Sequence, residues 1–99
     1  MKNLIANLNK AFESKVRLGI MAALTATDEM DFNTLKTLLE VTDGNLASHL
    51  KALEKEKYIS VTKQFIDRKP NTRYHATKEG RKAFREHIDA LEKLISGAQ

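Results

Sequence analysis

The hydrophobic positions between residues 42 and 57 recur at helical spacing. Leu46, Leu50 and Leu53 stand at i, i+4 and i+7, which puts them in one narrow stripe of a helix. Thr42 precedes this stripe, and its hydroxyl can accept from the free N–H groups of a first helical turn. The opposite face is short-chained and uncharged at first and carries lysines later: Gly44, Asn45 at its edge, Ser48, Lys51 and Lys55. Such a face suits a flat, polar, negatively charged partner, although a solvated surface helix is the plain alternative.

The same spacing predicts further helices on both sides of residues 42–57. Two of them are expected over residues 3–12 and from Ser14 to about Thr25. A third is expected to begin at a cap, Asp31 or Asn33, and to end at Leu39 or Glu40, with Leu35, Leu38 and Leu39 facing inward. The last is expected over residues 78–95, after a cap at Thr77. β-Branched and aromatic residues predict a very short strand at residues 30–32 and longer strands at residues 58–66 and 72–76. Residues 67–71 form a turn cluster, where Pro70 is expected because proline cannot donate to a strand ladder.

The order of these elements indicates one fold class. A helix, a tight turn, a second helix and a β-hairpin are typical of a winged helix-turn-helix. The prediction is therefore an α+β, mainly α, single domain over residues 1–99, with a winged helix-turn-helix core at residues 14–76, a two-stranded hairpin as the wing and flanking N- and C-terminal helices.

The charge of the chain is unevenly distributed. The formal net charge is +4. Between residues 61 and 82, seven basic side chains face two acidic ones, an excess of +5 that leaves the remainder at −1. The basic residues are Lys63, Arg68, Lys69, Arg73, Lys78, Arg81 and Lys82, and the acidic ones are Asp67 and Glu79. A local basic patch of this kind implies an acidic partner such as a phosphate backbone.

Several classes of protein are disfavoured by what the sequence lacks. It contains no cysteine, no apolar run near the ~20 residues that span a bilayer and no secretory signal, so a cytoplasmic location without membrane contact is expected. No glycine-rich phosphate loop or nucleophile–base arrangement indicates an enzyme or a cofactor. Glu86, His87 and Asp89 do not gather on one helix face, so no metal site is expected.

Three motifs carry a resemblance to a known family. They are Leu46-x-x-His49-Leu50-x-x-Leu53-Glu54, the wing sequence Arg68-Lys69-Pro70, and Thr77-x-x-Gly80-Arg81. Together with residues 14–24 they resemble small MarR/ArsR-type winged-helix transcriptional regulators, and the likeness spans residues 14–81 in the family's order. One departure is Lys57, because many relatives have glycine before the wing strand, which places the local turn geometry in question.

The resemblance implies a homodimeric DNA-binding repressor or activator. Asn45 and Ser48 would face base edges in the major groove, where an asparagine can bond adenine through two hydrogen bonds. Lysines on the helix and wing would contact phosphates without reading sequence, and His49 is expected to be partly buried and bonded to backbone or phosphate. The complete expected set is Thr42, Asp43, Gly44, Asn45, Ser48, His49, Lys51, Lys55, Lys63, Arg68, Lys69, Asn71 and Arg73.

The terminal segments add the expectation of a dimer. Their apolar stripes would form an exposed patch, which usually marks an interface. The expected dimerisation residues are Leu4, Ile5, Leu8, Phe12, Ile88, Leu91, Leu94 and Ile95. Packing of these residues against the chain's own core is one alternative, and a winged-helix module that binds protein instead of DNA is the alternative function. No residue points to an effector ligand.

Overall fold

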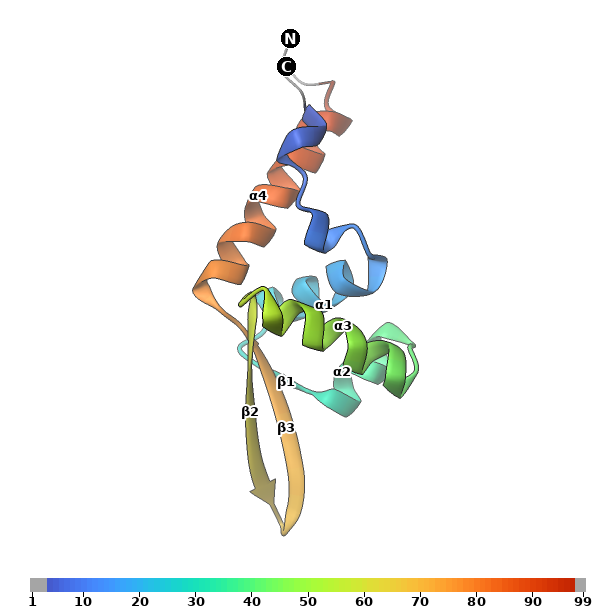
Figure 1. The fold of residues 1–99 in the computed structure, drawn as a ribbon, viewed down its shortest axis with the longest axis vertical. Helices are drawn as coiled ribbons and strands as arrows, with labels where there is room; N and C mark the ends of the chain where they lie inside the picture. The colour runs from blue at the N-terminus through green and yellow to red at the C-terminus, as the bar shows by residue number, and fades with distance from the viewer. Residues whose placement is uncertain (1–3, 98–99) are drawn as a thin grey trace.

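The computed structural model describes residues 4–97, and of Leu4 only the backbone. In chain order the elements are the 3-10 turns η1 (Leu4–Asn7) and η2 (Lys10–Phe12), α1 (Lys15–Ala26), β1 (Met30–Asp31), α2 (Phe32–Leu39), α3 (Asp43–Lys55), β2 (Ile59–Ile66), β3 (Lys69–Ala76) and α4 (Lys78–Ile95). The molecule is elongated, 58 × 25 × 21 Å, with a helical body between the β2–β3 hairpin at one end and α4 with the N-terminal segment at the other (Figure 1). The mainly helical winged helix-turn-helix class is confirmed.

Each α-helix begins at a polar side chain that accepts a backbone N–H of its first turn. The four bonds run from Arg17 N to Ser14, from Thr34 N to Asp31, from Asn45 N to Thr42 and from Gly80 N to Thr77. The expected starts near Ser14, Thr42 and Thr77 are therefore confirmed, and Asp31 caps α2, one of the two alternatives. Because these bonds span three residues, the sequence alone could locate them.

The core lies where α1, α2 and α3 meet the base of the sheet. Its fully buried side chains are Ile20, Met21, Leu24, Leu35, Leu46 and Leu53. The expectation that Leu38 faces inward is wrong, since its side chain is 57% exposed. On α2 Leu38 and Leu39 lie on opposite sides of the buried Leu35, and the core lies on the side of Leu39.

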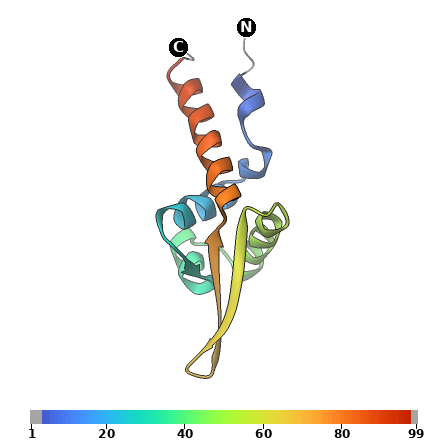
Figure 2. The same ribbon diagram turned by 90° about the vertical axis from the view of Figure 1, so that its left-hand side faces the viewer.

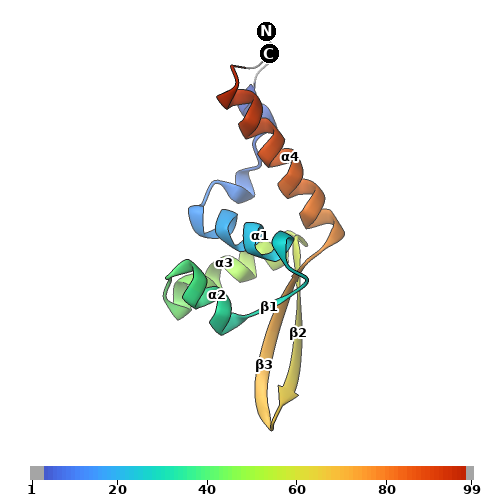
Figure 3. The same cartoon turned by 180° about the vertical axis from the view of Figure 1, so that it is seen from behind.

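The sheet is antiparallel in the order β1-β3-β2, with β1 paired to the base of β3 (Figure 3). The hairpin turn is shorter than expected. It consists of Asp67 and Arg68 alone, whose φ angles of 51° and 65° are typical of a type I′ turn.

Pro70 therefore lies inside β3, opposite Phe65, and its expected place in the loop is wrong. In a two-residue hairpin the closing pair, here Ile66 and Lys69, exchanges hydrogen bonds, so the next pair is of the non-bonded type. The nitrogen of Pro70 then points away from β2. On that other side of β3, β1 pairs only with Arg73 and Tyr74, so Pro70 has no partner strand and no ladder bond is lost.

The junction between α3, β2 and α4 keeps the geometry that a glycine would give. Lys57 has a φ of 66°, so the left-handed turn before the wing is present despite the lysine. The carbonyl of the next residue, Tyr58, accepts from Thr77 N at 3.0 Å, and the Thr77 hydroxyl lies within reach of the carbonyl oxygens of Lys57 (2.8 Å) and Tyr58 (3.1 Å). Gly80 lies against this carbonyl, and a Cβ at Gly80 would stand 2.0 Å from the Tyr58 oxygen. The start of α4 is thus fixed to the start of the wing.

The predicted N-terminal helix over residues 3–12 is wrong, and its first residue lies outside the described part of the chain. Asn9, in extended conformation, separates two 3-10 turns. Its backbone N–H donates to Nδ1 of His87 (2.9 Å) and its side-chain nitrogen donates to the Tyr58 hydroxyl (3.0 Å). These bonds to distant elements hold Asn9 extended, which prevents one continuous helix.

Phe12 belongs to the core of its own chain. It is 2% exposed, and its ring packs on those of Tyr58, Phe84 and His87 at centroid distances of 5.3, 5.9 and 5.3 Å. The expectation that Phe12 takes part in a dimer surface is therefore wrong. The alternative, packing against the chain's own core, applies to this residue.

α4 has the predicted bounds but a different buried face. Its buried residues are Gly80, His87 and Ala90, while Ile88 and Leu91 of the predicted stripe are half-buried. The N-terminal segment runs beside α4 toward the same end of the molecule (Figure 2) and covers that face. No helix within residues 4–97 is long and apolar enough to cross a membrane.

Candidate nucleic-acid interface

The outer face of α3 is exposed and polar, as the sequence predicts. Leu46, Leu50 and Leu53 fix the inner face in the core. The opposite side presents Gly44, Asn45, Ser48, Lys51 and Lys55, all exposed. The side chains of Asn45 and Ser48 make no hydrogen bond within the described residues, so their polar atoms are available to a partner.

The N-terminus of α3 is open to solvent. Thr42 and Asp43 are exposed, and the Asp43 carboxylate pairs with Lys36 Nζ of α2 at 2.7 Å. A Cβ added to Gly44 would meet no atom within 4 Å. Free N–H groups and the positive end of the helix dipole thus remain accessible for an anion at this point.

His49 connects α3 to α1. The ring is half-buried, as expected, but its partner is neither backbone nor phosphate: Nδ1 accepts from Nε of Arg17 at 3.0 Å. Burial, with a smaller effect from the Arg17 charge, lowers the pKa of His49 below its usual range. The neutral ring can accept this bond, so His49 helps to set the position of α3 on α1.

The wing carries free positive charge at its tip and midway along β2. Lys63, Arg68 and Lys69 are exposed and form no ion pair within the described residues. The two-residue turn puts Arg68 at the end of the hairpin. These three cations therefore match the sequence-based expectation of a basic wing.

Arg73 and Asn71 are engaged elsewhere. Arg73 Nη1 pairs with Glu29 Oε2 at 2.9 Å, and Arg73 Nε donates to Asn71 Oδ1 at 2.9 Å. His75 lies on the same strand face, with Nε2 3.6 Å from Glu29 Oε1. This cluster ties the base of the wing to the loop after α1. Sequence reasoning missed Glu29 because it lies 44 residues from Arg73.

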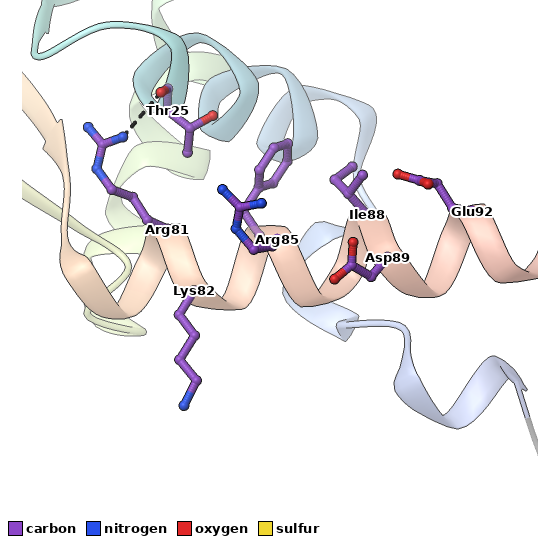
Figure 4. Close-up of a pocket in the computed structure, with 8 residues that line it drawn as sticks. Thr25, Arg81, Lys82, Arg85, Ile88, Asp89 and Glu92 are labelled. Carbon is purple, nitrogen blue, oxygen red and sulfur yellow. Dashed lines mark hydrogen bonds between the residues drawn. The ribbon is translucent and has the colours of Figure 1, made fainter.

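A groove of about 520 Å³ runs along α4 beside the end of α1 (Figure 4). Arg81 closes one end, since its guanidinium donates to the carbonyl oxygens of Leu24, Thr25 and Thr27 at the end of α1. Further along α4 the lining changes from basic to acidic, with half-buried Ile88 between Arg85 and Glu92.

His87 is the buried polar residue of α4. It is 5% exposed and accepts from the backbone of Asn9, and burial lowers its pKa although the nearby Glu13 opposes that shift. The described residues contain no group of three or more histidine, aspartate or glutamate side chains that could hold a metal ion. Through its hydrogen bond with Asn9, His87 fixes the N-terminal segment to α4.

Comparison with known proteins agrees with this geometry. A family model described as a winged helix DNA-binding domain matches residues 16–95. An uncharacterized protein of Methanocaldococcus jannaschii is 40% identical over 85 residues, which are 86% of this chain and 92% of that protein.

Solved structures show the same fold. A transcriptional regulator homologue from Pyrococcus horikoshii OT3 superposes with a TM-score of 0.78 at 29% identity, covering 89% of this chain and 92% of that one. The YusO protein from Bacillus subtilis gives a TM-score of 0.78 at 18% identity over 94% of this chain and 68% of its own. The chain therefore belongs to the winged helix DNA-binding domain family, as the likeness to small winged-helix regulators predicts.

Proposed function

We propose that this protein is a sequence-specific, double-stranded DNA-binding regulator of transcription. α3 lies in the major groove and the β2–β3 wing lies on the backbone or in the minor groove. The observation that carries the proposal is the outer face of α3, whose polar side chains have no partner within the described residues. The regulator fold of the Pyrococcus protein supports the regulatory role. The cytoplasmic location expected from the sequence stays a prediction.

The chemistry of α3 suits modest direct readout of bases. Asn45 can form two hydrogen bonds to an adenine edge, and Ser48 can pair with several bases. The exposed Lys51 and Lys55 follow on the same face and would contact phosphates. A phosphate near the open backbone of Gly44 would gain from the helix dipole.

The wing contacts are fewer than the sequence suggests. Lys63, Arg68 and Lys69 are free to reach DNA. Arg73 and Asn71 serve instead to hold the wing base against Glu29, and His49 serves to place α3. Affinity from the wing should therefore depend on Lys63, Arg68 and Lys69 and not on Arg73 and Asn71.

A salt titration tests the proposal. The duplex is first selected from a random DNA pool, and fluorescence anisotropy then gives its affinity between 0.05 and 0.3 M salt. Each phosphate contact contributes about 0.9 to the slope of log affinity against log salt, so five contacts per chain give a slope of about −4.5 for one bound chain and about −9 for a dimer. Affinity that does not change with salt, or no duplex binding at the lowest salt, contradicts the proposal and favours a protein partner.

We further propose that the protein acts as a homodimer through the exposed side of α4. Ile95 is 84% exposed, and Leu94 is also exposed. Along the groove, basic Arg85 precedes Ile88 and acidic Glu92 follows it. Two antiparallel copies of α4 that cross at Ile88 would place the basic half of each helix beside the acidic half of the other, which is the self-complementarity of a two-fold contact. A near-palindromic operator would follow.

Charge reversal tests this dimer. Arg85→Glu is expected to shift the mass in analytical ultracentrifugation from two chains to one, because it puts like charges opposite each other twice per dimer. The double variant Arg85→Glu/Glu92→Arg should restore the two-chain mass, since each pair is reversed but kept. A wild-type mass of one chain at micromolar concentration, or a dimer that Arg85→Glu leaves intact, contradicts this arrangement.

A further inference from the structure

The two faces of the wing differ because side chains alternate along each strand. Ile59, Tyr74 and Ala76 point into the core with the leucines of α3. Following the register from Ile59, every second residue of β2 shares that face, so it continues toward the tip through Lys63 and Phe65. Arg73 and Asn71 lie on the opposite face. The side of the wing that faces α3 therefore ends in a phenylalanine.

Phe65 is a large aromatic side chain left in solvent. It is 77% exposed, although full burial of a phenylalanine is worth about 1.5–3 kcal/mol. The residue opposite it is Pro70, also exposed, and directly paired residues of antiparallel strands share a face. Phe65 and Pro70 thus form one apolar patch near the tip, which contributes nothing to the core of the described chain.

Positive charge surrounds this patch. Lys63, Arg68 and Lys69 lie within five residues of Phe65, against the single carboxylate of Asp67. A second wing tip would repel these cations, which disfavours a second copy as the occupant. A duplex offers phosphates for the cations and, between its phosphate rows, the apolar C–H groups of the deoxyriboses.

We propose that Phe65 and Pro70 pack against the deoxyribose wall of the DNA minor groove. This inference rests on the proposed DNA-binding function and adds to it a contact that does not depend on charge. The patch lies on the flat side of the hairpin, two residues before the turn, so it meets the wall of a groove that the tip enters. Arg68 at the tip supplies the charged contact and Phe65 the apolar one.

The test compares Phe65→Ala, Phe65→Leu and Arg68→Ala on the duplex selected by the wild-type protein. Phe65→Ala is expected to weaken binding about 10-fold at every salt concentration with an unchanged salt slope, because apolar burial releases no counterions. Phe65→Leu keeps an apolar side chain and should stay within about threefold of the wild type. Arg68→Ala should instead reduce the slope by about 0.9 for each bound chain, about 1.8 for a dimer. The high exposure of Phe65 makes misfolding of these variants unexpected, and circular dichroism checks it.

Hydroxyl-radical footprinting locates the contact, since this reagent attacks deoxyriboses. The wild type should protect a short run of sugars at the wing site, and Phe65→Ala should lose that protection while keeping protection around α3. Salt-dependent wild-type binding with no effect of Phe65→Ala on affinity or footprint overturns this inference alone. Absence of wild-type binding to any duplex overturns the proposed function as well. A change in sedimentation caused by Phe65→Ala without a change in DNA affinity assigns the patch to protein contact and also overturns the inference.

Discussion

A Gly80→Ala variant is expected to lose about 3 kcal/mol or more of its free energy of unfolding. The new Cβ would stand 2.0 Å from the Tyr58 carbonyl oxygen, and the next nearest atoms, at 2.8 and 2.9 Å, are also Tyr58 backbone. Backbone cannot rotate away as the end of a side chain can. Relief of the clash would move the carbonyl that accepts the backbone N–H of Thr77. The measurement is urea unfolding followed by circular dichroism.

Gly44→Ala is the matched control for this substitution. Both glycines lie in the first turn of a helix that a threonine caps, but a Cβ at Gly44 meets nothing within 4 Å. Alanine there should leave stability unchanged or raise it by up to about 1 kcal/mol, because it is the better helix former. Equal tolerance of alanine at the two positions would show that α4 does not start against Tyr58 as described.

The double variant Arg68→Ala/Lys69→Ala is expected to weaken DNA binding roughly 50-fold per bound chain at 0.1 M salt and to reduce the salt slope by about 1.8 per bound chain, so a dimer loses about twice that slope. Both side chains are exposed at the wing tip and have no ion-pair partner within residues 4–97, so each can release a counterion from DNA. The loss should be similar for all sequences, because phosphate contacts carry no sequence information. Anisotropy titrations at several salt concentrations measure both quantities.

The control removes the same charge elsewhere. Lys82 and Lys93 are exposed on α4, away from the wing tip, and Lys82→Ala/Lys93→Ala should change the slope little. Asn45→Ala should instead alter the preference among sequences at an almost unchanged slope. If the α4 lysines affected the slope as much as the wing pair, DNA would lie on a different face of the molecule.

The parts of the fold that depend on near neighbours in sequence were predictable. Thr42 and Thr77 cap helices through bonds that span three residues. The leucine stripe at Leu46, Leu50 and Leu53 fixes which face of α3 enters the core, and hence which face stays out. The orientation of Asn45 and Ser48 follows from the same helical period.

The parts that depend on distant partners were not predictable. Phe12 looks like an interface residue in sequence, but three aromatic rings from other elements bury it. Arg73 looks like a free wing cation, yet Glu29 from another loop binds it. The periodicity of a single segment does not predict such contacts, because the two residues come together only when the chain folds.

The sequence by itself thus determined the order of elements, the polar outer face of α3 and the basic character of the wing, since helix period, caps and net charge are local properties. Only the tertiary structure decided which cations remain free, how the N-terminal segment lies on α4 and that Phe65 stands exposed beside them. Those outcomes depend on competition between distant groups for the same space and the same hydrogen bonds. The pattern of residues within one segment therefore does not predict those outcomes.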